Sequence, residues 1–217
     1  MAAGAVKARH TWEELQKIIN SKDPEALGIL GRSQEQLDTY LKRRAEILKE
    51  WASAGDNLRF RLFGSPTKLN EDGQLVVDAD NDHTAHECHI MVMRNEYGYY
   101  LDEGLEHINI WCSDRPLSAE VVEAIIRERL PCEAYLWFVN PPQYQSIKAI
   151  WHAHVMVKGL KEEHSHISAP GEVEVLDPEA YLQASRRRVE EGQAGQAAAA
   201  AGQGAAGTGQ SASGTRS

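Results

Sequence analysis

Two histidines in alternate positions are the most chemically suggestive feature of this sequence. The segment Trp151–Met156 reads Trp-His-Ala-His-Val-Met and is bounded by loop signals, as strands are. In a strand, side chains at i and i+2 point to the same face, about 6.6 Å apart along the chain. His152 and His154 can therefore reach one bound group while Ala153 and Val155 face the core. We expect a site here; the alternative is a histidine that only hydrogen-bonds at a sheet edge.

The same alternation occurs in the segment Glu106–Cys112. It would place His107, Asn109 and Trp111 on one face of a strand and aliphatic side chains on the other. Polar groups would then gather where a ligand can enter. The alternative for Trp111 is that it covers a sheet edge.

Uncharged donors follow other predicted strands. Asn95 comes just before a turn, where its amide could meet a ligand or cap its own backbone. Asn140, Gln145 and Ser146 lie in a loop between two predicted strands; the alternative is that this loop is a plain proline connection. Amides and hydroxyls suit a phosphate held by hydrogen bonds rather than by salt bridges. The candidate residues are His152 and His154 for catalysis, and Asn95, His107, Asn109, Asn140, Gln145 and Ser146 for ligand binding.

Metal and cofactor motifs are weak in this sequence. His83, His86, Cys88 and His89 are of the types that bind zinc, but their spacing matches no closed structural site. A cupin-type metal site would need a glutamate shortly after the histidine pair, and Met156–Lys161 contains none. No glycine-rich phosphate loop or dinucleotide fingerprint occurs. We therefore predict no metal and no cofactor.

Capping signals predict how the chain begins. Thr11 with Glu14 and Ser33 with Gln36 are capping boxes, and each is followed by apolar residues at helical spacing. Two amino-terminal helices are expected, the second being the longer.

The remainder of the domain is predicted to be mostly strands. One helix should start at Ser118 and end at Pro131, and a last helix, capped by Asp177, should span Pro178–Val189. This order favours an α+β domain with an antiparallel sheet, amino-terminal helices and one crossover helix over a doubly wound fold. The predicted strands are Arg59–Phe63, Leu75–Val77, Cys88–Arg94, Leu105–Cys112, Tyr135–Val139 and Ile150–Val157.

Composition divides the 217 residues into three parts. Residues 192–217 are rich in Ala, Gly and Gln and lack large apolar side chains, so we expect a disordered tail. Residues 11–191 should form a single α+β domain, and residues 1–10 a flexible amino terminus.

Charge and cysteine usage restrict the setting. The net charge of −9 argues against nucleic-acid or anionic-membrane partners. No apolar run is long enough to span a membrane, and Met1–His10 lacks the apolar stretch of a secretory signal. Three cysteines without a CxxC pair fit buried thiols in a reducing compartment. We expect a cytoplasmic protein; the sequence leaves the oligomeric state open.

Five motifs, together with the amino-terminal helices, span most of the chain before Gly159. They are Met93–Tyr99, Gly104–Trp111, Trp137–Pro141, Gln145–Ile147 and His152–Val155. In these motifs the sequence resembles the fungal N-acetylglucosamine-induced protein family, a domain-of-unknown-function family. The resemblance implies a link to amino-sugar response rather than a particular reaction.

A second resemblance is to the histidine-triad (HIT-like) nucleotide hydrolases and transferases. It implies that His152 attacks an α-phosphate to give a nucleotidyl-histidine, that His154 holds phosphoryl oxygens, and that Gln145 and Ser146 donate hydrogen bonds. Ile150 stands where that family has its first histidine. The residues that carry the resemblance, in order, are Asn95, Asn140, Gln145, Ser146, His152 and His154.

These observations lead to three functional hypotheses. The first is binding of a phosphorylated small molecule, a nucleotide or sugar nucleotide, by a nucleotidyl hydrolase or transferase. The second is a non-catalytic regulatory protein with the same ligand, and the third a two-histidine phosphoesterase. The basic runs Lys42–Arg44 and Arg186–Arg188 are expected to serve helical charge pairing rather than binding.

Overall fold

The computed structural model describes residues 5–169 and 172–204, with side chains as far as Gln193. It forms two compact units, Met1–Pro178 and Glu179–Ser217. Helix α5, Pro178–Gly204, begins at the last residue of the first unit and continues through the second. This helix continues well past the predicted end at Val189, because the alanines that follow are strong helix formers. Residues 1–4 and 205–217 of the predicted terminal segments lie outside the described residues.

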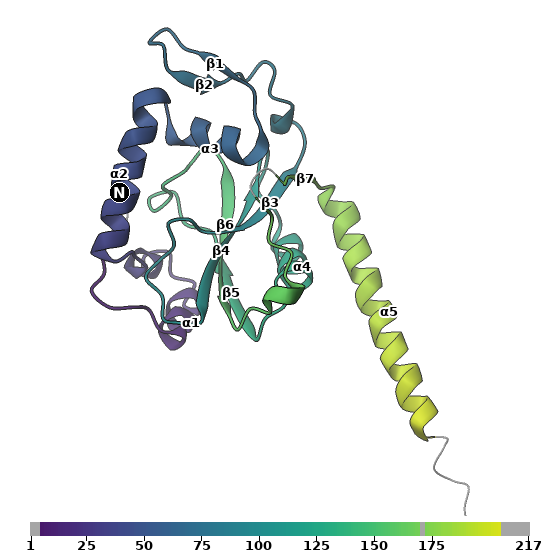
Figure 1. Ribbon diagram of the computed structural model, residues 1–217. Helices are drawn as coiled ribbons and strands as arrows, with labels where there is room; N and C mark the ends of the chain where they lie inside the picture. Colours follow the sequence, from purple (N-terminus) through teal and green to yellow (C-terminus); the bar gives the residue numbers. More distant parts are fainter. Residues whose placement is uncertain (1–4, 170–171, 205–217) are drawn as a thin grey trace, which may run out of the picture. The chain divides into compact units, whose positions relative to one another are not determined.

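The first unit is built on a five-stranded sheet with the order β5-β6-β4-β3-β7, in which every pair of neighbours is antiparallel (Figure 1). Helix α4, Ala119–Arg129, lies between β4 and β5 along the chain. The prediction of an α+β domain with an antiparallel sheet is therefore confirmed. The strands are β3 His89–Arg94, β4 Leu105–Cys112, β5 Ala134–Phe138, β6 Trp151–Lys158 and β7 Glu174–Val175.

The two amino-terminal helices begin where the capping boxes predicted. Helix α1 spans Trp12–Asn20 and helix α2 spans Gln34–Glu50. Both reciprocal hydrogen bonds of the capping box are present in each helix. Short 3₁₀ turns lie at Ala26–Ile29 (η1), His83–Ala85 (η2) and Glu162–His164 (η3).

The predicted strand Arg59–Phe63 is wrong, because this segment ends helix α3, Ala54–Phe63. Ser53 caps the helix by accepting a hydrogen bond from the Asp56 amide at 3.0 Å. Gly64 ends it in the left-handed conformation, with φ of 68°. The alternation of Arg and apolar residues is too short to distinguish helix from strand.

Strand β2, Leu75–Val77, is confirmed, but its partner is β1, Thr67–Leu69, which was not predicted. The two strands form a separate two-stranded sheet, and the turn between them contains Gly73 in the left-handed conformation. This hairpin follows α3 and contributes no residue to the cavity described below.

The sheet has one apolar and one polar face, as strand alternation predicted. Ile108, Ile110, Ala153 and Val155 are fully buried on the apolar face. Helix α4 lies on one side of the sheet in Figure 1, and α1, α2 and α3 on the other. On the side of α1 and α3, core clusters combine helical with sheet residues. One cluster contains Trp12, Leu15, Phe138 and Met156, and the other contains Leu62, Phe63, Met91 and Trp111.

Since Trp111 and Met156 share the face of the histidines, helices α1 and α3 cover the polar face of the sheet. Within the described residues, no helix is both long enough and apolar enough to cross a bilayer.

Candidate functional site

A cavity of about 110 Å³ lies between the polar face of the sheet and helices α2 and α3. One water needs only about 10–15 Å³ on the same measure, so the cavity has room for a small organic group. The sheet contributes His152, His154, Asn109, Trp111 and Met93. The helical side contributes Tyr40, Ile47, Asn57, Leu58 and several arginines, and Asn95, Ser146 and Ile147 lie between the two walls.

The hydrogen bonding of His152 fixes its tautomer. Its Nδ1–H donates to the Ile150 carbonyl oxygen at 3.0 Å, and its ring stacks on Trp111 with the centroids 4.3 Å apart. A carbonyl can only accept, so the proton is on Nδ1 and the lone pair is on Nε2. Among the described residues, no group hydrogen-bonds to Nε2. Burial lowers the pKa of His152, opposed by the bond to Ile150, so the ring is neutral near pH 7.

His154 is instead held at the end of a hydrogen-bond chain. The Tyr99 backbone amide donates to His107 Nδ1 at 3.1 Å, which leaves the His107 proton on Nε2. This Nε2–H donates to His154 Nδ1 at 2.8 Å, and the Asn109 amide donates to the same atom at 3.2 Å. The longer contact of His107 Nε2, at 3.3 Å, is with the side-chain amide of Asn95. The His154 proton is therefore on Nε2.

Asn140 closes the chain, because its side-chain amide lies 2.9 Å from His154 Nε2. We assign the amide oxygen to the side that faces His154, since the Nε2–H needs an acceptor there. In this orientation the Tyr99 hydroxyl, 3.2 Å from the same amide atom, donates to that oxygen as well. The atom on the opposite side of the amide is buried without a partner among the described residues in either orientation, so the choice rests on the His154 Nε2–H. Both ring nitrogens of His154 are thus engaged by the protein.

Burial keeps this chain neutral. Desolvation, with smaller contributions from Arg32 and His152, lowers the pKa of His107 to about 3. Desolvation is also the largest cause that holds the pKa of His154 well below its usual value. The charges of the neighbouring His107, His152 and Arg32 lower this pKa further. The bound ligand would therefore meet uncharged imidazoles on the sheet.

The predicted site residues fall into two groups. His152, His154, Asn95, Asn109 and Ser146 line the cavity. The other three are not among its lining residues.

His107 and Asn140 lie behind His154 and fix its orientation. Gln145 donates to the Asn140 backbone oxygen at 2.7 Å and so braces the loop after β5. These three residues position the cavity wall rather than face the cavity.

The sequence analysis missed the arginines of the helical wall. Arg43 pairs with Glu46 at 3.4 Å, as helical charge pairing predicted, yet both Arg43 and Arg44 line the cavity. This corrects the expectation that the basic run serves charge pairing alone. One face of α2 turns inward, and the spacing of its residues could have indicated this. The positions, three or four residues apart, are Tyr40, Arg43, Arg44 and Ile47. The charged lining residues are Arg32, Arg43, Arg44, Arg61, Arg94 and Glu96.

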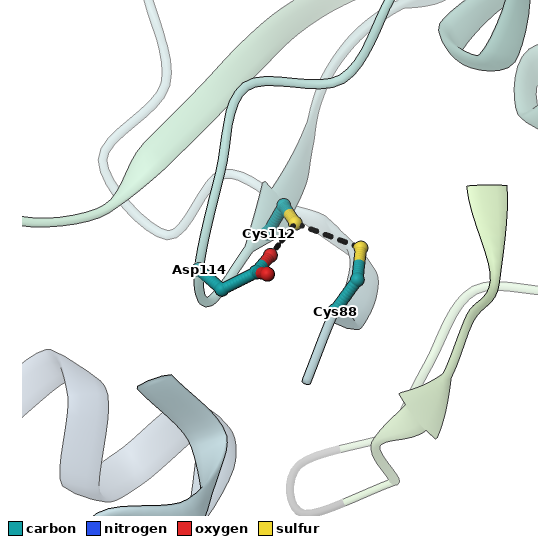
Figure 2. Close-up of side chains that lie close together, drawn as sticks. All are labelled: Cys88, Cys112 and Asp114. Carbon is teal, nitrogen blue, oxygen red and sulfur yellow. Dashed lines mark hydrogen bonds between the residues drawn. The ribbon is translucent and has the colours of Figure 1, made fainter. Parts of the chain in front are cut away.

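A separate cluster contains the groups in the described chain that could hold a metal. Figure 2 shows Cys88, Cys112 and Asp114 facing one another, with the two sulfurs 3.0 Å apart and Cys112 Sγ 3.5 Å from Asp114 Oδ1. Asp114 is also engaged by Arg115, which pairs with its other carboxylate oxygen, Oδ2, at 2.6 Å. The hydrogen bond to Cys112, together with burial, raises the pKa of Cys88. These groups do not line the cavity.

Comparisons with known proteins place the chain in a wider group. A family model described as "Protein of unknown function (DUF3605)" matches residues 11–120 and 114–158. The chain is 23% identical over 199 residues to N-acetylglucosamine-induced protein 1 of Candida albicans, covering 79% of this chain and 77% of that protein. It is 25% identical over 172 residues to the uncharacterized protein YPL067C of Saccharomyces cerevisiae, covering 71% and 81%.

A crystal structure of HTC1 aligns with a TM-score of 0.47 at 22% identity, over 71% of this chain and 90% of that chain. The resemblance to the N-acetylglucosamine-induced family is confirmed by the family and Candida matches. The residues that line the cavity all lie within the matched segments.

Proposed function

The chain belongs to the DUF3605 family of proteins of unknown function, and we propose that it binds a phosphorylated small molecule between its sheet and its amino-terminal helices and transfers a phosphoryl or nucleotidyl group through His152. The observation that carries the proposal is the state of this one imidazole. Nδ1 is anchored to the Ile150 carbonyl, and Nε2 is unprotonated and unpartnered among the described residues of a cavity that has room for a small organic group. A neutral, fixed imidazole is the form that attacks phosphorus.

The transfer would occur in two steps. The Nε2 lone pair attacks phosphorus, an Nε2–P bond forms, and the P–O bond to the leaving group breaks with its electron pair. The leaving group departs as a phosphate-type anion, so it requires no proton. The ring keeps its Nδ1–H and becomes cationic, and the hydrogen bond to the Ile150 carbonyl stabilises that charge. Water then attacks phosphorus, the Nε2–P bond breaks, and a proton is released to solvent.

The lining supports an organic phosphate as the ligand. Arginines outnumber the single carboxylate among the charged lining residues, so an anion is attracted to the cavity although the whole protein is negative. Ile47, Leu58, Met93 and Ile147 add apolar surface that suits the ring of a base or sugar. A nucleotide or sugar nucleotide combines both properties.

His154 has a positioning role in this proposal. The histidine-triad resemblance would have it hold phosphoryl oxygens, but both of its ring nitrogens are hydrogen-bonded to protein groups. His107 and Asn140 orient its ring beside His152, whose centroid is 5.0 Å away. The buried Ile150 occupies the position of the first triad histidine and contributes its carbonyl group instead.

Trapping the intermediate tests the proposal. The protein is incubated with a panel of α-³²P nucleotides and searched for acid-labile label on the chain. We expect label on the wild type and on the control His164→Asn, which alters an exposed histidine, and none on His152→Asn. Label that persists in folded His152→Asn would overturn the assignment of the nucleophile. A ligand that binds in stoichiometric amount to the wild type without label or product would refute catalysis.

A non-catalytic binding protein is the second candidate. The observation that favours it is the engagement of His154, which leaves no second imidazole with a free nitrogen among the described cavity residues to hold phosphoryl oxygens during transfer. The same observation weighs against a two-histidine phosphoesterase. In either case we propose a cytoplasmic protein without nucleic-acid or membrane partners, in keeping with its charge and cysteine usage.

A further inference from the structure

The arginines of the cavity differ in whether an acidic partner neutralises them. Arg43 pairs with Glu46 at 3.4 Å and Arg61 with Glu96 at 3.3 Å. Arg94 pairs with Glu106 and with Glu162. Three of the five positive charges are therefore balanced by the protein itself.

Arg32 and Arg44 have no carboxylate partner among the described residues; both are held by Tyr40. The Arg32 guanidinium lies over the Tyr40 ring, 4.5 Å from its centroid, and its Nε donates to the Tyr97 carbonyl at 2.8 Å. Arg44 Nη1 donates to the Tyr40 hydroxyl at 3.3 Å. Neither guanidinium therefore has an acid beside it among the described residues. Both terminal nitrogens of Arg32 and one terminal nitrogen of Arg44 take no part in the contacts given above.

Arg32 and Arg44 are both partly buried, and burial is costly for a charge without a partner. Desolvation accordingly lowers the pKa of Arg32. An anion bound by both guanidinium groups would relieve this cost, and phosphate oxygens match their planar N–H groups. The arrangement is therefore that of a binding site for a phosphate group.

We propose that Arg32 and Arg44 bind a second phosphate group, so that the ligand is a diphosphate ester, either a nucleoside diphosphate or a nucleoside-diphosphate sugar. This inference rests on the proposed function, in which the first phosphate lies at His152 in the same cavity. The second phosphate is then the leaving group. The two arginines stabilise the anion that forms when the P–O bond breaks, and Arg43 and Arg61 stay with their own carboxylates.

Calorimetric titration of the full chain tests the inference. The probes are AMP and ADP, UMP and UDP, and a UDP-linked sugar. We expect each diphosphate to bind the wild type at least tenfold more tightly than its monophosphate. Arg44→Gln should weaken diphosphate binding about 10- to 100-fold, the effect of losing one charge-assisted hydrogen bond, with less than a threefold effect on monophosphates. Lys42→Gln removes a charge from the same helix outside the cavity and should change each affinity less than twofold.

Three results would overturn the inference: equal wild-type affinity for monophosphates and diphosphates, equal weakening of both by Arg44→Gln, or the same loss in Lys42→Gln. If Arg44→Gln does not fold, Arg44→Lys and Arg32→Lys provide the same comparison, because lysine keeps the charge but loses the planar contact. The comparison of a nucleoside diphosphate with the UDP-linked sugar distinguishes the two ligand sources. The titrations measure binding alone, so a protein that never becomes labelled refutes the His152 chemistry without deciding this question.

Discussion

Acidification from pH 8 to pH 5 should destabilise the protein through the buried chain of His107 and His154. His107 has a folded pKa of about 3 against an ordinary value of 6.5, and that of His154 is lowered in the same direction. Below pH 6.5 the unfolded chain therefore binds protons that the folded chain excludes. The stability that neutrality confers is complete above pH 6.5 and is lost as the pH falls towards 3.

The magnitude follows from the distance to the ordinary pKa. At pH 5 an unfolded histidine lies 1.5 units below its pKa of 6.5, while folded His107 is still neutral. One unit corresponds to about 1.36 kcal/mol, so excluding the proton from His107 costs about 2 kcal/mol at pH 5. The lowered pKa of His154 adds to this loss in the same direction between pH 8 and pH 5.

The variant His107→Gln isolates the contribution of His107 to this loss. Its side-chain amide can accept from the Tyr99 N–H and donate to His154 Nδ1, but it does not titrate. The free energy of unfolding, measured by urea denaturation at pH 8, 6.5 and 5, should fall about 2 kcal/mol less in the variant than in the wild type. With an m-value of about 2 kcal/mol per M, the difference is about 1 M in the urea midpoint. Parallel curves would show that folded His107 accepts a proton, and the hydrogen-bond chain described above would be refuted.

Other predictions concern the framework of the site. Ile108→Ala, at a fully buried position of β4, should lower the free energy of unfolding measured in urea by about 2–5 kcal/mol. The control is Leu69→Ala: Leu69 is 65% exposed, so the free energy should change by less than about 0.5 kcal/mol. Similar losses in the two variants would contradict the burial assigned to these positions. Ser53→Ala should lower the free energy of unfolding by about 1 kcal/mol and reduce the helical circular dichroism signal on mild heating. An unchanged free energy of unfolding would argue against the cap of α3. Deletion of residues 193–217 should leave the urea midpoint of the remaining chain unchanged, and a shift of more than about 0.5 M would show that the domain extends beyond residue 192.

Much of the fold was predictable because its signals are local. The capping boxes at Thr11 and Ser33 place two helix starts, since the partners lie three residues apart. The alternation around Ile108 and Val155 identifies two central strands and their buried faces, because strand side chains alternate strictly. Helix α3 was missed because its alternating arginines imitate a strand, although Ser53 and Gly64 mark its two ends.

The cationic wall of the cavity was not predictable in the same way. Whether Arg44 faces solvent or a ligand depends on how α2 packs over the sheet, and a run of basic residues beside Glu46 fits both outcomes. The same holds for Arg32, whose guanidinium is held by Tyr40 and Tyr97 from other parts of the chain.

The sequence by itself determined that His152 and His154 share one face of a strand. It determined likewise that His107 and Asn109 share one face of another strand, because both relations follow from the two-residue period of a strand. The tertiary structure alone decided which of the paired imidazoles is free. Antiparallel pairing sets Asn109 opposite His154, and the loop after β5 brings Asn140 to its other nitrogen. Within the part of the chain that the structure describes, His152 hydrogen-bonds to the Ile150 carbonyl, two residues away, and to no group from a distant segment.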